Sequence, residues 1–79
     1  MKVAVTSLVR EQAEKRFSPA DAWTACAELA AADLPLIANN GERVHLAILH
    51  LAAGDLAHFR RHLAIARIDW RDVLVAAGF

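Results

Sequence analysis

The segment HFRRH, residues 58–62, contains the side chains best suited to chemistry in this sequence. Its two histidines stand four residues apart, which places both imidazoles on one side of a helix. This spacing lets two ring nitrogens bind one metal ion, as in HExxH zinc sites. Phe59 follows His58, so the glutamate base of those sites is missing, and a zinc ion needs further ligands. The candidates for these ligands are His45, His50 and Cys26.

The arginines between the two histidines disfavour a metal ion. Arg60 and Arg61 repel a cation, and Cys26 falls on an apolar helix face, where a thiol behaves as a small hydrophobic group. We therefore assign no metal ligands and no cofactor. A metal-binding regulator remains the weakest of three functional hypotheses.

The same arginines favour a nucleic-acid partner more than a metal. Residues 56–71 hold four arginines, two histidines and only one acidic residue. Residues 42–67 also have the outline of a helix-turn-helix, with 55–67 as the recognition helix. That helix lacks the Ser, Thr, Asn and Gln side chains that often contact base edges. The alternative hypothesis is thus a small dimeric DNA-binding regulator, which would use Arg60, Arg61 and Arg67.

A protein partner accounts best for this helix face. His58, Arg61, His62 and Ile65 recur at the spacing of one helical stripe, and arginine is enriched at protein interfaces. Ile65 is an apolar side chain that a partner would cover. Leu46 and Leu49 form a second apolar stripe on the preceding helix. These six residues are the predicted partner interface.

The elements that position these side chains are marked by capping residues. Ser18 and Pro19 are typical of a helix start, and Pro35 should end or bend that helix. Further N-caps are expected at Asp55 and Asp69, directly before two apolar periodic segments. The remaining helix ends and loops are predicted from Asn39-Asn40-Gly41, Gly54 and Gly78.

Between these boundaries the apolar residues follow a helical period. In 20–33 the predicted apolar face is Trp23, Cys26, Ala27 and Ala30, which makes Trp23 a core or interface residue. The segment 42–53 has two apolar stripes, so it is either a central helix or part of a subunit interface. The segments 56–67 and 70–77 each have one stripe, beginning at Leu56 and Trp70.

The sequence therefore predicts an all-α, single-domain bundle of four to five short helices over residues 1–79. Its centre is an antiparallel hairpin of 42–53 and 55–67, with 20–33 and 69–77 packed against it. A first helix is expected at about 7–17, although Val3 and Val5 also suit a short strand. Residues 49–66, LHLAAGDLAHFRRHLAIA, resemble the middle of a tetratricopeptide repeat, and the resemblance implies the same antiparallel hairpin.

Composition narrows the class of function. The chain is 57% hydrophobic with zero formal net charge, whereas dedicated nucleic-acid binders usually carry a basic excess. One cysteine excludes an intrachain disulfide and favours a reducing compartment. No apolar run reaches the roughly 20 residues of a membrane span, and we expect no secretion signal. No catalytic motif is present, so we predict a non-catalytic, bacterial-type cytoplasmic homo-oligomer or protein-interaction module.

Overall fold

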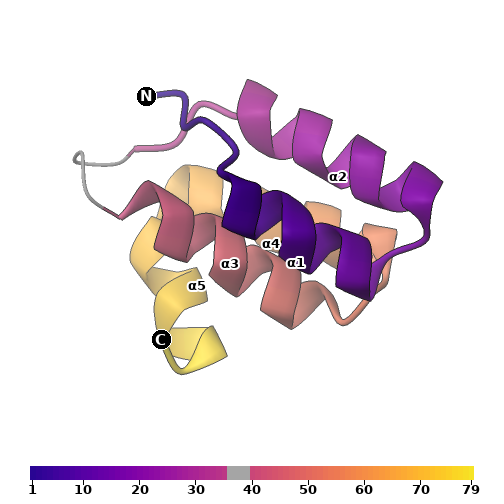
Figure 1. Cartoon of the computed structure of the whole chain (residues 1–79). Helices are drawn as coiled ribbons and strands as arrows, with labels where there is room; N and C mark the ends of the chain where they lie inside the picture. The colour runs from indigo at the N-terminus through magenta and orange to yellow at the C-terminus, as the bar shows by residue number, and fades with distance from the viewer. Residues whose placement is uncertain (36–39) are drawn as a thin grey trace.

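The computed structural model describes residues 1–35 and 40–79, and this part of the chain folds into five helices (Figure 1). None of these residues forms a strand, so the predicted all-α bundle is confirmed. None of the helices is long and apolar enough to cross a membrane. The helices are α1 (Ser7–Arg16), α2 (Pro19–Ala31), α3 (Gly41–Ala52), α4 (Leu56–Ile68) and α5 (Trp70–Ala77).

Side-chain caps fix the starts of three helices where the sequence places them. The Ser18 hydroxyl accepts a hydrogen bond from the Asp21 amide at 3.3 Å, and the Asp55 carboxylate accepts one from the His58 amide at 3.0 Å. Asp69 accepts from the Arg71 amide, also at 3.0 Å. These amides hold the pKa of Asp55 and Asp69 below the usual aspartate value. The three predicted N-caps are confirmed.

Two of the predicted boundaries need correction. Gly41, expected in a loop, is the first residue of α3, and Asn39 lies outside the described residues. Pro35 does not itself end α2, which stops at Ala31 with Ala32 as its C-cap. Gly54 and Gly78 do follow helix ends, and both have the left-handed backbone that glycine accepts readily.

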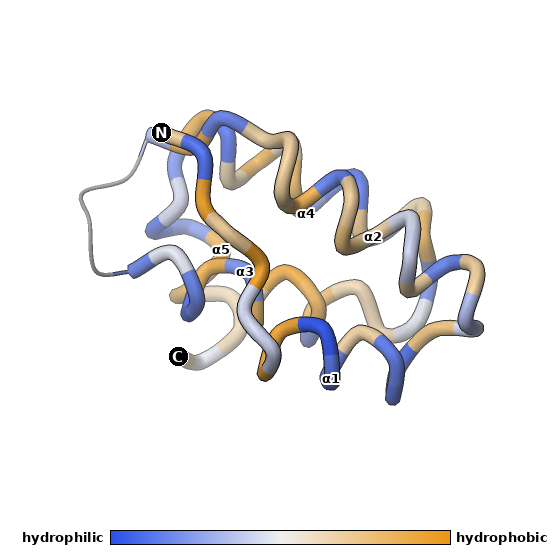
Figure 2. The backbone as a smooth tube through the Cα atoms, turned by 45° about the horizontal axis from the view of Figure 1, so that its top comes forward, coloured by the Kyte–Doolittle hydropathy of each residue, from blue (hydrophilic) through white to orange (hydrophobic). Residues whose placement is uncertain are grey.

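Helix α3 is the centre of the bundle. It packs against α1, α4 and α5, and α4 returns behind it in Figure 1 as the second arm of the predicted hairpin. Its own chain therefore covers the first apolar stripe of this helix and part of the second, in which Leu49 is buried and Leu46 is half-buried. Apolar stretches also occur in the N-terminal segment and in the other helices, coloured orange in Figure 2. Within the core, the Phe17 and Phe59 rings pack edge to face, with their ring centroids 6.1 Å apart.

The buried face of α2 differs from the prediction. Cys26 is buried as expected, but Trp23, Ala27 and Ala30 are exposed. The core side of the helix is formed instead by Ala22, Ala25, Cys26 and Leu29. Six of the thirteen residues of α2 are alanine, so several stripes have similar hydrophobicity. Leu29, the one large aliphatic side chain of α2, lies on this buried face, where its removal from water stabilises the packing.

The N-terminal segment docks on its own chain without forming a strand. Residue Lys2 makes a single antiparallel bridge with Asp33. Backbone hydrogen bonds of 2.9 Å join Met1 and Leu34 in both directions, and the Met1 amino group also pairs with the Asp33 carboxylate. The side chain of Val3 then lies against Gly41, at the start of α3.

The contact between Val3 and Gly41 gives a first prediction. A Cβ atom at position 41 would lie 2.4 Å from Val3 Cγ1, so Gly41→Ala should lower the free energy of unfolding by about 1 kcal/mol. Val3→Ala removes both γ carbons and leaves only the Cβ atom of residue 3, at 3.3 Å, so most of the overlap is relieved. In this background the higher helix propensity of alanine should make Gly41→Ala neutral or stabilising, by up to about 1 kcal/mol. Urea unfolding of the four chains of this double-mutant cycle measures both values. The same effect of Gly41→Ala in both backgrounds would contradict the proposed contact.

Candidate interaction surface

Three of the predicted interface residues are exposed on α4. His58, Arg61 and Ile65 lie on the outside of this helix, and His62 is half-buried beside them. Ile65 is 36% exposed, so its own chain covers most of the side chain and only part of it is available to a partner. The four residues do share one face, but they form a mainly polar surface with a single small apolar area.

The electrostatics of this face disfavour a cation. Burial lowers the pKa of the His62 side chain, and the nearby Arg61 and His58 lower it further. His62 is therefore neutral at pH 7, but Arg61 would repel any cation that approached the ring. Within the residues described, no group of three or more His, Cys, Asp or Glu side chains is arranged to hold a metal ion.

The arginines of the DNA-binding hypothesis are not equally available. Arg60 forms an ion pair with Glu28 of α2, with Nη2 to Oε2 at 2.8 Å and Nε to both carboxylate oxygens at 3.2 Å. This pair joins α2 to α4, and the carboxylate raises the pKa of the Arg60 guanidinium above its ordinary value. Arg61 and Arg67 are exposed, and Arg67 lines a shallow hollow that Glu28 also lines. The neighbouring carboxylate reduces the positive field on this side of α4.

The two leucines predicted at the interface have different positions. Leu49 is fully buried in the core, so it does not lie on a surface of the folded chain, and its assignment to the interface is wrong. The second stripe of α3, which suggested an interface, packs against other helices of the same chain. Leu46 is half-buried and lines a hollow of about 230 Å³ with Leu8 and Phe79.

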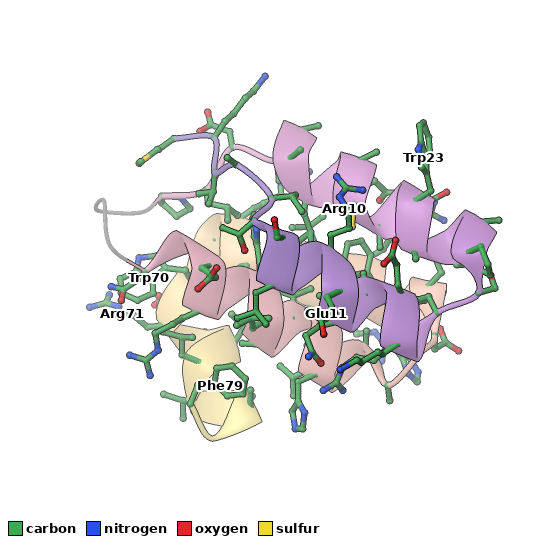
Figure 3. All side chains as sticks on the ribbon, viewed as in Figure 1. Arg10, Glu11, Trp23, Trp70, Arg71 and Phe79 are labelled. Carbon is green, nitrogen blue, oxygen red and sulfur yellow. The ribbon has the colours of Figure 1, made fainter. Side chains whose placement is uncertain are left out.

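Trp23, which belongs to the predicted apolar stripe of α2, has the most exposed aromatic side chain. Trp23 is 71% exposed and extends outward from α2 in Figure 3. Ala27 and Ala30, on the same side of the helix, are also exposed. Burying a tryptophan removes a large apolar area from water, so this side chain gains more from a partner than most exposed groups.

A hollow lies next to Trp23, between α1 and α2. It has a volume of about 240 Å³, and a smaller hollow of about 160 Å³ continues it along α2. Taken singly, each hollow is smaller than the roughly 300–1,000 Å³ of typical small-molecule sites, and each can receive a side chain of another protein. We refer to their lining residues together as the Trp23 surface: Arg10, Glu14, Pro19, Ala22, Trp23, Cys26, Ala27 and Ala30.

Opposite charges from α1 stand at the edge of the Trp23 surface. Arg10 and Glu14 both line the larger hollow, and Arg10 rises from α1 towards α2 in Figure 3. Across residues 1–35 and 40–79, neither of these side chains lies within 4.0 Å of an opposite charge. Both charges are thus free to pair with groups on a docked partner.

The Cys26 thiol is the one potential nucleophile of the Trp23 surface. Burial raises its pKa above the ordinary cysteine value, Arg10 partly opposes this effect, and Glu14 adds to it. The thiol is therefore protonated at neutral pH, and a protonated thiol is a poor nucleophile. No histidine lines either hollow to act as its base. The arrangement can bind an apolar group and flanking charges, and it offers no activated group for catalysis.

The four α4 residues lie on one face as the sequence predicts, whereas the sequence left Trp23 as a core or interface residue and did not indicate the hollow beside it. One sequence feature does indicate that Trp23 is exposed. If Leu29 is taken to lie on the buried face of α2, Trp23 falls on the exposed side.

Comparison with protein-family models, curated proteins and solved structures finds no match for this chain.

Proposed function

We propose that this chain is a non-catalytic protein-interaction module that binds through the Trp23 surface. The observation that carries the proposal is the 71% exposed Trp23 beside a hollow between two helices. Tryptophan and arginine are the residues most enriched at interaction hot spots, and both are present here. We include a cytoplasmic location in the proposal, because the only cysteine is buried and unpaired, as expected in a reducing compartment.

The predicted α4 face is a second candidate surface of the same module. It includes Ile65 and adjoins Ile68, which is 85% exposed at the end of the helix. Each of the predicted residues has less apolar area than Trp23, and none of them is a tryptophan, tyrosine or phenylalanine. We therefore consider it the weaker candidate. Separate substitutions at Trp23 and Ile65 distinguish the two surfaces.

Replacement of Trp23 tests the proposal directly. Trp23→Ala should leave the melting temperature nearly unchanged, because the indole is mostly exposed, while it removes most binding to any partner. The tagged chain is used to capture interacting proteins from the cells that produce it, and quantitative mass spectrometry compares the variants. Val75→Ala is the matched control, since Val75 is an exposed apolar residue on α5.

The outcomes distinguish binding through the Trp23 surface, binding through the α4 face and binding to nucleic acid. Partners that Val75→Ala retains and Trp23→Ala loses would support the Trp23 surface. Partners lost only with Ile65→Ala would assign binding to the α4 face, and equal capture by all variants would reject both surfaces. Capture that disappears after nuclease treatment, and that falls steeply with salt, would support nucleic-acid binding through Arg61 and Arg67 instead.

A further inference from the structure

We propose that the partner of the Trp23 surface is a second copy of the same chain, docked about a two-fold axis. This inference rests on the proposed function and specifies who binds. It requires each copy to present both a projecting group and a place to receive one. Trp23 projects, and the hollow lies directly beside it on the same surface. A two-fold axis brings the same surface of both copies together, so such a surface is complementary to itself.

The charges of the surface favour the same partner. Helices α1 and α2 run in opposite directions, joined by the short connection at Phe17 and Ser18 (Figure 1). Arg10 lines both hollows and so lies towards Ala30, whereas Glu14 lines only the hollow at the Pro19 end. A two-fold axis that passes perpendicular to α1 and α2 at the level of Trp23 exchanges these two ends. It therefore sets Arg10 of each copy opposite Glu14 of the other, and both unpaired charges gain a partner.

The remaining properties of the surface allow close approach. Formal net charge is zero, so two copies do not repel each other at long range. Ala27 and Ala30 carry only methyl groups, which let a second helix come near and leave room for a flat indole. Cys26 and Ala22 form an apolar floor that a charged or strongly polar guest would not satisfy.

A charge exchange between Arg10 and Glu14 tests the orientation of the dimer. Arg10→Glu leaves two acidic groups at these positions, and Glu14→Arg leaves two basic groups. Either variant alone should self-associate at least about tenfold more weakly than the wild type, because both cross-copy pairs become like-charge pairs. A mixture of the two variants should associate like the wild type, since every acidic group then faces a basic one. The double variant R10E/E14R should also restore association.

Sedimentation velocity of the purified chains over the micromolar to millimolar range gives these affinities. Trp23→Ala should weaken the dimer about a hundredfold, since each dimer loses two anchors, whereas Val75→Ala should not change it. In a Trp70→Phe background, Trp23 is the only tryptophan, and its emission should shift to shorter wavelength as concentration rises.

Two results would overturn the inference. One is a monomer at every concentration, and the other is a dimer that tolerates Trp23→Ala or is not rescued by mixing the charge variants. Circular dichroism of each variant confirms that it is folded before its association is compared. If the purified chain is monomeric while Trp23→Ala still loses partners from cells, the second-copy inference fails and the proposed function stands. If Trp23→Ala changes neither measurement, both fail.

Discussion

Replacing Gly54 by alanine is expected to lower the free energy of unfolding by about 3 kcal/mol, although Gly54 is an exposed residue between α3 and α4. Two costs contribute. The backbone at Gly54 has φ +77°, where a side chain costs roughly 1–2 kcal/mol. A Cβ atom there would also lie 2.7 Å from the carbonyl oxygen of Arg16, and backbone shifts that relieve such overlaps cost typically about 1–3 kcal/mol.

Gly78 provides the matched control for this prediction. It has nearly the same backbone angle, φ +75°, but a Cβ atom there would meet nothing within 4 Å. Gly78→Ala should therefore cost only the conformational part, roughly 1–2 kcal/mol. Chemical denaturation of the two variants measures the difference. Equal losses of stability would mean that the Arg16 carbonyl can move away without cost, and would remove the steric part of the prediction.

Replacing His45 by leucine is expected to stabilise the protein by about 1–3 kcal/mol at pH 7. His45 is fully buried on α3, and neither ring nitrogen has a hydrogen-bond partner. A buried polar group without a partner loses its hydration and gains nothing in return. Leucine has a similar volume and fills the same space with apolar atoms.

The same replacement should remove an acid sensitivity. Burial lowers the pKa of His45 to about 4, from its usual 6.5, because the charged ring has no solvation in the core, and Glu42 only partly opposes this. Between these two values the unfolded chain takes up a proton that the folded chain does not bind. This proton uptake leaves the free energy of unfolding unchanged above pH 6.5 and lowers it as pH falls towards 4, by about 3 kcal/mol in total.

Urea unfolding at several pH values between 7 and 4.5 measures this slope in the wild type and in His45→Leu. The wild type should lose more stability than the variant over this range. His50→Leu is the control on the same helix, because the His50 side chain is exposed in the folded chain and its loss should leave the slope in place. An unchanged slope in His45→Leu would show that other groups cause the acid sensitivity.

The fold was predictable where one residue type decides local structure. Ser18, Asp55 and Asp69 mark helix starts because a short polar side chain before an apolar run can accept from the free amides of the first turn. Phe59 and Val73 belong to the apolar stripes that begin at Leu56 and Trp70, and both are buried as that spacing predicts. The predicted boundaries of the helices then follow within two residues.

The surface was less predictable, because it depends on contacts between elements. The alanines of α2 give no clear period, so the buried face of this helix was predicted incorrectly and Trp23 was left as either a core or an interface residue. The pair of Arg60 with Glu28 joins residues 32 positions apart, and no local pattern marks such a contact. Leu49 and His45 are buried because other helices cover α3 on several sides. The two stripes of α3 were compatible with either a central helix or a subunit interface, so they could not predict this burial.

The contact of Gly54 with Arg16 also bears on how the molecule folds and unfolds in time. The contacts within the α1–α2 pair and within the α3–α4 pair join segments close in sequence, so each pair closes a short loop and can form early. Gly54 and Arg16 lie 38 positions apart and meet only when the two pairs dock. Strain at this junction would then act mainly on the rate of unfolding and little on the rate of folding. We therefore expect Gly54→Ala to shorten the lifetime of the native state through faster unfolding, while the rate of folding changes little.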